Sequence, residues 1–121
     1  MLCIKSIKGL SEQEIMNIYE IIDITDDIHE CDVLIYEKSK ENEIFGCLGM
    51  KVNVINFIHV KKDYRNKGIG KKMLNFAKTL SPKALEIHLK KNKKDMLSYF
   101  LQLQFVIENE EDDKIILIQQ K

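Results

Sequence analysis

The residues best suited to chemistry lie between Val60 and Lys72, in the stretch VKKDYRNKGIGKK. Within it, Gly68 and Gly70 separate a β-like run that ends at Val60 from a helical pattern that begins near Ile69. The first N–H groups of a helix are unpaired and lie at the positive end of its dipole, so they bind phosphate groups well. Glycine has no Cβ and lets the main chain approach such a ligand closely. This stretch is therefore predicted to bind a phosphate.

Two well-known phosphate loops do not fit these glycines. The Walker loop requires Ser or Thr after its Gly-Lys pair, but Lys72 follows here, and no glycine lies five residues before Gly70. The dinucleotide fingerprint requires a third glycine where this chain has Met73. Neither kind of nucleotide loop is expected.

The segment from Arg65 to Gly70 resembles instead the acetyl-CoA pyrophosphate loop of the GNAT superfamily of N-acetyltransferases, R/Q-x-x-G-x-G/A. The likeness extends upstream, where Val60 precedes Arg65 by five residues, and downstream into the helical run from Lys71 to Leu74. The resemblance implies that acetyl-CoA is the cosubstrate and that no metal is needed.

The resemblance also assigns residues to acetyl-CoA. Backbone N–H groups from Lys67 to Lys71 would hold the pyrophosphate, with Arg65 bracing the loop or touching phosphate and Lys71 or Lys72 near the 3′-phosphate. The strand before the loop is expected to bulge and splay from the next strand, so that its backbone pairs with the pantetheine arm and polarises the thioester oxygen. The expected cofactor residues are Ile58, His59, Val60, Arg65, Asn66, Lys67, Gly68, Ile69, Gly70, Lys71 and Asn92.

Two alternatives stay open for these assignments. Asn92 matches an asparagine that commonly touches the arm in the family, but it suits a helix cap equally well. The loop itself could be an ordinary glycine turn flanked by solvated lysines.

Tyr99 is the expected catalytic acid, because many family members use a tyrosine to protonate the departing thiolate. The family pattern places six residues between an asparagine and this tyrosine, as between Asn92 and Tyr99, and a Gly-Phe pair later. Counting back from Phe105 places Phe100 at the tyrosine position instead, and Gln104 replaces the glycine. We favour Tyr99.

No general base is assigned from the sequence. Some relatives use a glutamate at the position of Val54. His59 has a suitable intrinsic pKa, but it alternates to the face of Phe57 and is expected to be a structural strand histidine, and His29 and His88 are no better candidates. Cys47 as a nucleophile would need a basic partner that the sequence does not show. A water relay or an amine that arrives neutral would need no dedicated base.

Composition indicates one soluble domain, residues 1–121, with 45% apolar and 31% charged residues. Its 19 basic and 19 acidic side chains balance, so nucleic acid is not an expected partner. The odd set Cys3, Cys31 and Cys47 argues against a disulfide framework. No run is long enough for a membrane span or a signal peptide, so a cytoplasmic location is expected.

The periodicity predicts an α+β fold in the order β-α-β-β-β-α-β-α-β-β, which matches the GNAT order: a mixed, mostly antiparallel sheet with helices on both faces. A capping box at Ser11 and Glu14 begins the first helix. The expected strands are Leu2–Ile7, Val33–Glu37, Glu43–Lys51, Val54–Val60, Leu85–Leu89 and a terminal hairpin around Glu110–Asp113; the expected helices are Glu12–Ile22, Ile69–Leu80 and Lys94–Leu103.

Regular alternation and helical spacing also predict which side chains share a face. The expected sets are Ile15, Ile18, Tyr19 and Ile22 in the first helix; Ile44, Gly46, Leu48 and Met50 in one strand; Ile55, Phe57 and His59 in the next; and Ile69, Met73, Phe76, Ala77 and Leu80 in the second helix.

The acidic segment Asp23–Asp32 is expected to be a solvated loop and not a metal site, because it lacks EF-hand spacing. It leaves little room for the second helix that family members usually place there. Since that region commonly forms a wall of the acceptor pocket, the resemblance implies an open or reshaped substrate site.

The expected function is transfer of an acetyl group from acetyl-CoA to a primary amine, small-molecule or peptide, by direct attack. One alternative is a catalytically weak or inactive module of the same fold that binds CoA or a protein. Another is a sheet protein that binds no CoA. Exposed edges of the terminal hairpin could mediate a homodimer.

Overall fold

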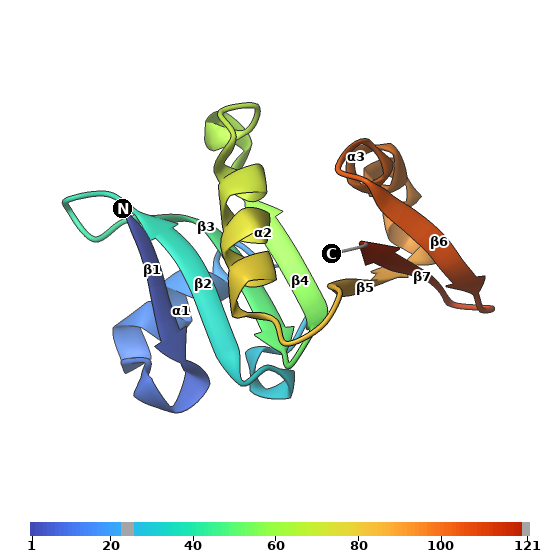
Figure 1. Cartoon of the computed structure of the whole chain (residues 1–121). Helices are drawn as coiled ribbons and strands as arrows, with labels where there is room; N and C mark the ends of the chain where they lie inside the picture. The colour runs from blue at the N-terminus through green and yellow to red at the C-terminus, as the bar shows by residue number, and fades with distance from the viewer. Residues whose placement is uncertain (23–25, 120–121) are drawn as a thin grey trace.

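The computed structural model describes residues 1–22 and 26–119, which form one mixed sheet with helices on both of its faces (Figure 1). The sheet has seven strands in the order β1-β2-β3-β4-β5-β7-β6. Neighbouring strands are antiparallel except β4 and β5, which are parallel. The predicted fold class and element order are confirmed. The elements are β1 (Leu2–Ser6), α1 (Glu12–Tyr19), β2 (Val33–Lys38), β3 (Ile44–Lys51), β4 (Val54–Val60), α2 (Ile69–Leu80), β5 (Glu86–Lys90), α3 (Leu97–Gln102), β6 (Phe105–Glu110) and β7 (Lys114–Gln119).

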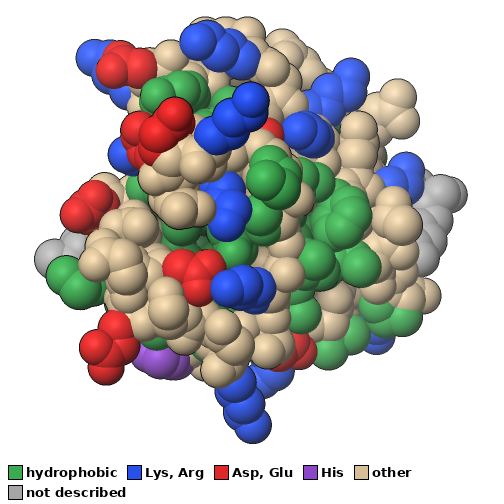
Figure 2. Space-filling model, turned by 90° about the vertical axis from the view of Figure 1, so that its left-hand side faces the viewer, with side chains coloured by type: hydrophobic (Ala, Val, Ile, Leu, Met, Phe, Trp, Pro, Cys, Tyr) green, Lys and Arg blue, Asp and Glu red, His purple; other side chains and the backbone are tan. Residues whose placement is uncertain are grey.

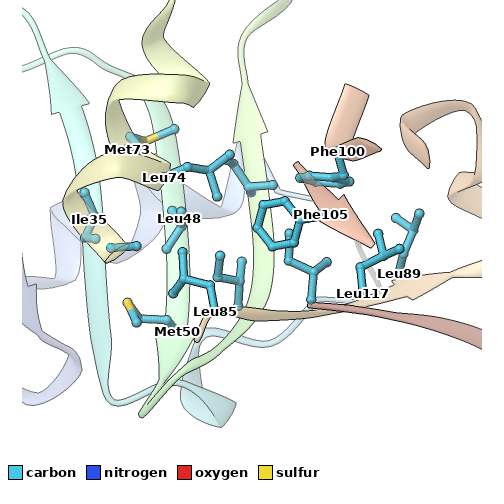
Figure 3. Packing of buried hydrophobic residues seen from close by; sticks show 14 of the residues in the cluster. Ile35, Leu48, Met50, Met73, Leu74, Leu85, Leu89, Phe100, Phe105 and Leu117 are labelled. Atoms are coloured by element: carbon cyan, nitrogen blue, oxygen red, sulfur yellow. The ribbon is translucent and has the colours of Figure 1, made fainter. Parts of the chain in front are cut away.

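Two hydrophobic clusters hold the helices against the sheet. On one face, Ile18 of α1 packs with Cys47 and Phe57 of the sheet. On the other face, Met73 and Leu74 of α2 join side chains from the sheet, and α3 adds Phe100 to the same cluster, as Figure 3 shows. The burial of apolar side chains on both faces is what fixes the sheet between its helices.

A β-bulge in β4 changes which side chains face each cluster. Gly49 pairs with Phe57 and Met50 with Ile55, so Asn56 has no opposite residue on β3. A residue added in this way reverses the alternation along a strand. As a result Ile55 lies in the α2 cluster while Phe57 lies in the α1 cluster, and the prediction that they share a face is wrong.

Three other predicted face positions are wrong as well. Ile44 packs in the α1 cluster, whereas Leu48 and Met50 pack in the α2 cluster, because the register of β2 and β3 shifts next to Ile44. Tyr19 and Leu80 lie at the ends of their helices, where the sheet no longer covers them, and are 45% and 43% exposed.

The segment that precedes β2, predicted as a solvated loop, and the segment that precedes β6, predicted as one helix, also differ from the prediction. Asp26 and Ile28 are not solvated: the Asp26 side chain is 10% exposed, and Ile28 is fully buried within a short 3₁₀ turn, Ile28–Glu30. Residues 23–25 of the same predicted loop lie outside the described residues. The helix predicted to begin at Lys94 is a 3₁₀ segment, Lys91–Met96, followed by α3.

The parallel pair β4 and β5 separates after a short contact. Only Val54 with Glu86 and Ile55 with Ile87 are paired, and beyond them the two strands diverge (Figure 1). The predicted bulge and splay of this strand are therefore confirmed. The sheet opens at the end of β4 that leads into the glycine loop.

Charged groups of both signs are interspersed over the molecular face shown in Figure 2. Within residues 1–22 and 26–119, no helix is both long enough and apolar enough to cross a bilayer. The same residues contain no group of three or more His, Cys, Asp or Glu side chains arranged to hold a metal ion.

Candidate functional site

The glycine loop places the start of α2 beside the opening in the sheet. Gly68 caps the helix with a φ of 80°, in the left-handed region that glycine adopts most easily. The first helical hydrogen bond runs from the Lys72 N–H to the Gly68 carbonyl. The N–H groups of Ile69, Gly70 and Lys71 therefore have no acceptor within the helix and can receive an anion.

Side chains of the loop brace it against the sheet. The Arg65 Nε–H donates to the Val60 carbonyl oxygen at 2.9 Å, so the structure shows Arg65 in its predicted bracing role. Tyr64 stacks on Phe45 of β3 with ring centroids 4.6 Å apart, and the Lys67 ammonium lies 5.5 Å from the Tyr64 ring. These contacts hold the loop in place before any ligand binds.

Two lysines, Lys71 and Lys72, are predicted near a 3′-phosphate, and only one of them lines the cleft that lies beside the glycine loop. Lys72 forms an ion pair with the buried Glu37 at 3.2 Å, which directs its ammonium toward β2. Lys71 lines the cleft instead, so of the two lysines it is the one placed to meet a ligand there.

A cleft of about 440 Å³ joins the loop, β4 and α3. Most of the predicted site residues meet there, whereas His59, Lys67 and Asn92 are not among its lining residues. Asn92 is exposed on the 3₁₀ segment, and it does not cap α3, whose N-cap is Met96. The cleft is lined by Ile58, Val60, Tyr64, Arg65, Asn66, Gly68, Ile69, Gly70, Lys71, Tyr99 and Leu103.

The backbone of β4 offers hydrogen-bonding groups to this opening at alternate residues. The Lys61 N–H donates to the Phe45 carbonyl, so His59, two residues earlier, also exchanges hydrogen bonds with β3, opposite Cys47. The backbone groups of Ile58 and Val60 then point away from β3, toward the gap that β5 leaves. The prediction that the His59 backbone also pairs with a ligand is therefore wrong.

Tyr99 lies in the cleft, whereas Phe100 lies in the core. A Cβ added to Gly70 would lie only 2.5 Å from the Tyr99 hydroxyl, which shows how closely the two approach. Phe100 is 1% exposed and packs edge-to-face on Phe105 with centroids 5.7 Å apart. Burial raises the pKa of Tyr99, which keeps its hydroxyl protonated and able to donate at neutral pH.

The conformation of Gln104 shows why the family pattern has a glycine at this position. Gln104 follows Leu103, the C-cap of α3, with a φ of 69°, the left-handed conformation in which a glycine commonly ends a helix. Gln104-Phe105 thus stands where the family has Gly-Phe, while Tyr99 still faces the cleft. Counting back from Phe105 still reaches Phe100, but Phe100 is buried, and the tyrosine that lines the cleft is Tyr99.

A second, much smaller cavity, of about 50 Å³, lies where β4 and β5 separate, and sequence reasoning missed it. Ile58 lines both this cavity and the cleft. The polar lining of the second cavity includes Asp26. Asp26 Oδ2 lies 2.8 Å from His59 Nε2, and Asp26 Oδ1 accepts from the Lys90 ammonium at 3.1 Å. Burial acts to raise the pKa of Asp26, but the hydrogen bonds from His59 and Lys90 outweigh it and leave the pKa below its ordinary value.

Cys47, considered as a nucleophile, is buried in the α1 cluster with no exposed surface. Burial raises the pKa of its thiol strongly. The thiolate, which is the nucleophilic form, is therefore suppressed, and the site does not use this residue.

The sequence from residue 29 to residue 109 matches the family model described as "Acetyltransferase (GNAT) domain". The chain belongs to this family. No curated protein sequence matches it.

Solved structures of GNAT acetyltransferases share the fold. The Campylobacter jejuni N-acetyltransferase PseH superposes with a TM-score of 0.68 at 15% identity, over 99% of this chain and 98% of that one. A chain of the NatC complex bound to Gag peptide and CoA gives 0.70 at 15% identity, over 99% and 98%. The PaiA N-acetyltransferase of Thermoplasma acidophilum in complex with coenzyme A gives 0.60 at 16% identity, over 73% of this chain and 60% of that one. This GNAT chain thus spans less than two thirds of the length of PaiA.

Proposed function

We propose that this GNAT protein transfers the acetyl group of acetyl-CoA to a primary amine of a small molecule or peptide. The observation that carries the proposal is the convergence of three features in one cleft: the free amides at the start of α2, the open edge of β4, and the Tyr99 hydroxyl. Acetyl-CoA needs an anion site, a strand-like partner for its arm, and a donor near its sulfur, and these features supply all three.

In this proposal, each group of residues binds one part of acetyl-CoA or acts in the transfer step. The N–H groups of Ile69, Gly70 and Lys71 hold the pyrophosphate, and Lys71 reaches toward the 3′-phosphate. Ile58 pairs with the pantetheine amides, and an N–H near Val60 stabilises the oxyanion as the amine attacks. The C–S bond then breaks, and Tyr99 gives its proton to the CoA thiolate and recovers one from solvent.

The test follows free thiol while the protein, acetyl-CoA and a panel of amines are mixed. Wild-type protein is expected to release CoA with at least one amine. Tyr99→Phe is expected to lower kcat roughly 100-fold, because general acid catalysis contributes on that order, and to leave KM for acetyl-CoA nearly unchanged. Tyr19→Phe, in an exposed tyrosine of α1, serves as the control and keeps wild-type kcat.

A CoA-binding module without turnover is the second candidate, favoured by the short connection between α1 and β2, where the described residues contain only the 3₁₀ turn Ile28–Glu30. Thermal unfolding separates the two. Stabilisation by acetyl-CoA with no thiol release across the panel supports the module. No stabilisation at all contradicts both candidates.

A further inference from the structure

We propose that His59, held by Asp26, is the general base that takes the proton from the acceptor amine; the inference rests on the acetyltransferase function proposed above. His59 Nε2 and Asp26 Oδ2 are 2.8 Å apart, and the two side chains are only 16% and 10% exposed. Both line the second cavity. A carboxylate bonded to an imidazole at a cavity wall is the arrangement by which a histidine base is oriented.

The hydrogen bond decides which ring nitrogen is basic. Asp26 also accepts from the Lys90 ammonium at 3.1 Å, and this contact favours its carboxylate form. A carboxylate only accepts hydrogen bonds, so the proton of a neutral His59 ring must sit on Nε2. Nδ1 then carries the lone pair and is the atom that can take a proton, while the negative charge of Asp26 stabilises the imidazolium that results.

The position of His59 along β4 matches the place where an acyl thioester would lie. It stands between Ile58 and Val60, whose backbone groups face the gap in the sheet. Its ring lies on the same strand face as Phe57, with ring centroids 6.1 Å apart, whereas Tyr99, on α3, places its hydroxyl beside Gly70 at the start of α2. The amine would therefore enter from the second cavity, and base and acid would act on opposite sides of the reacting carbon.

His88, the other histidine in the second cavity, is less suited to this task. Its Nε2 is bonded to Glu86 and its Nδ1 lies 3.4 Å from the Lys114 ammonium, so neither nitrogen presents a lone pair to the cavity. Because Ile87 pairs with Ile55, His88 is also level with Asn56, three residues or roughly 10 Å before His59 along the strand. The charged or titratable groups that share the cavity with His59 are Asp26, His88, Lys90 and Lys93.

The proton balance of the step closes. The alkylammonium ion first loses one proton to solvent. The neutral amine nitrogen then attacks the thioester carbon, one of its N–H protons passes to His59 Nδ1, and the C–S bond breaks as Tyr99 protonates the thiolate. His59 then returns its proton to solvent. The net reaction consumes an alkylammonium ion and acetyl-CoA and yields the amide, CoA thiol and one proton.

The first experiment measures kcat/KM for an accepted amine against pH in the whole protein, with kcat/KM calculated on the concentration of the neutral amine. In the wild type, kcat/KM is expected to fall at low pH, because an imidazolium cannot accept a proton. His59→Gln is expected to lower kcat/KM roughly 100-fold at neutral pH and to remove that fall, with KM for acetyl-CoA nearly unchanged, because the His59 backbone pairs with β3. His29→Gln, in an exposed histidine outside the cavity, is the matched control.

The second experiment needs no turnover. Nitrogen-15 NMR of the wild-type histidine rings is expected to show neutral His59 with its proton on Nε2, and Asp26→Asn is expected to mix the two tautomers. A proton on Nδ1 in the wild type overturns the proposal.

Three kinetic outcomes are decisive as well. Wild-type turnover with an unchanged pH profile in His59→Gln overturns this inference and leaves the acetyltransferase function standing. Loss of the low-pH limb in His88→Gln alone does the same. Absence of turnover in the wild type contradicts the proposed function, and this inference fails with it.

Discussion

Two glycines two residues apart serve this protein for different physical reasons. Gly68 has a φ of 80°, but a Cβ there would meet nothing within 4 Å, so the position requires conformational freedom and not space. Gly70 has an ordinary helical conformation, but a Cβ there would meet the Tyr99 hydroxyl at 2.5 Å. The first glycine shapes the anion site, and the second lets the tyrosine approach it.

Gly68→Glu is expected to abolish acetyl-CoA binding while the fold persists. The open space accepts the side chain, but its negative charge repels a phosphate at the same amides. Gly68→Ala, which bears the same backbone strain of about 1–2 kcal/mol without the charge, is the control and retains measurable binding. Calorimetric titration with acetyl-CoA checks both; unchanged affinity in Gly68→Glu would remove the phosphate assignment.

Gly70→Ala is expected to destabilise the wild type but not Tyr99→Phe. Without the hydroxyl, the nearest ring atom lies 3.6 Å from the new Cβ, an ordinary contact. The intrinsic helix preference of alanine over glycine is the same in both backgrounds and cancels in a double-mutant cycle. Urea unfolding of the four proteins should give a coupling of about 1 kcal/mol or more, and additive effects would show that the two groups do not meet.

At the scale of elements, α1 is held at its start by a capping box that the sequence predicts correctly. The Glu14 N–H donates to Ser11 Oγ, and the Ser11 N–H donates to Glu14 Oε1. Glu14 also accepts from Lys5 and from the Tyr36 hydroxyl of β2. One carboxylate thus links the helix start to two strands of the sheet.

Stability is expected to depend on pH through this carboxylate. Burial acts to raise the pKa of Glu14, but its hydrogen bonds outweigh burial and lower the pKa from 4.5 to about 2. A lowered folded pKa adds stability that is present above the unfolded pKa and is lost as the pH falls toward about 2.

Urea unfolding of Glu14→Gln against pH checks this. The variant should be less stable than the wild type at neutral pH, by about 1 kcal/mol after solvent screening, and the difference should vanish near pH 2. Glu12→Gln, in the same helical turn but outside the capping box, should show no such pH-dependent difference. If the wild type stayed more stable than Glu14→Gln at the lowest pH, the difference in the free energy of unfolding would not come from the charge of Glu14.

The sheet of the whole molecule has two parts, strands β1–β4 and strands β5–β7. A short parallel contact between β4 and β5 joins them. The cleft and the second cavity both lie at this division, and Ile58 lines each of them. A ligand that pairs with the open edge of β4 would extend the sheet where its own strands separate.

Amide hydrogen exchange should directly detect the pairing of acetyl-CoA with the open edge of β4. On addition of acetyl-CoA at 100 times Kd, the Ile58 and Val60 amides should slow by up to about 100-fold, because their exchange then requires release of the ligand. The His59 amide, already paired with β3, is the internal control and should change little. Equal protection of all three amides would contradict the alternation described for β4.

A homodimer through the terminal hairpin stays a prediction. β6 forms one edge of the sheet, and its Val106 and Ile107 are 47% and 50% exposed. Sedimentation at micromolar concentrations would determine the oligomeric state.

By itself, the sequence determined the order of elements, the glycine loop, the capping box and the family, because each of these is encoded by residues that are neighbours along the chain. Gly68, Gly70 and Arg65 act within a few residues of one another, and so do Ser11 and Glu14. Their interactions need no knowledge of how distant segments pack.

Only the tertiary structure decided how β4 presents its residues and what His59 contacts. The bulge at Asn56 arises from pairing with β3 and reverses the predicted faces. Asp26 lies in a segment that looked solvated, but its side chain is largely covered because folding brings it to His59 and Lys90 on two strands. Such contacts depend on long-range packing, which local periodicity does not encode, and for that reason the acceptor side of the site could not be predicted from the sequence.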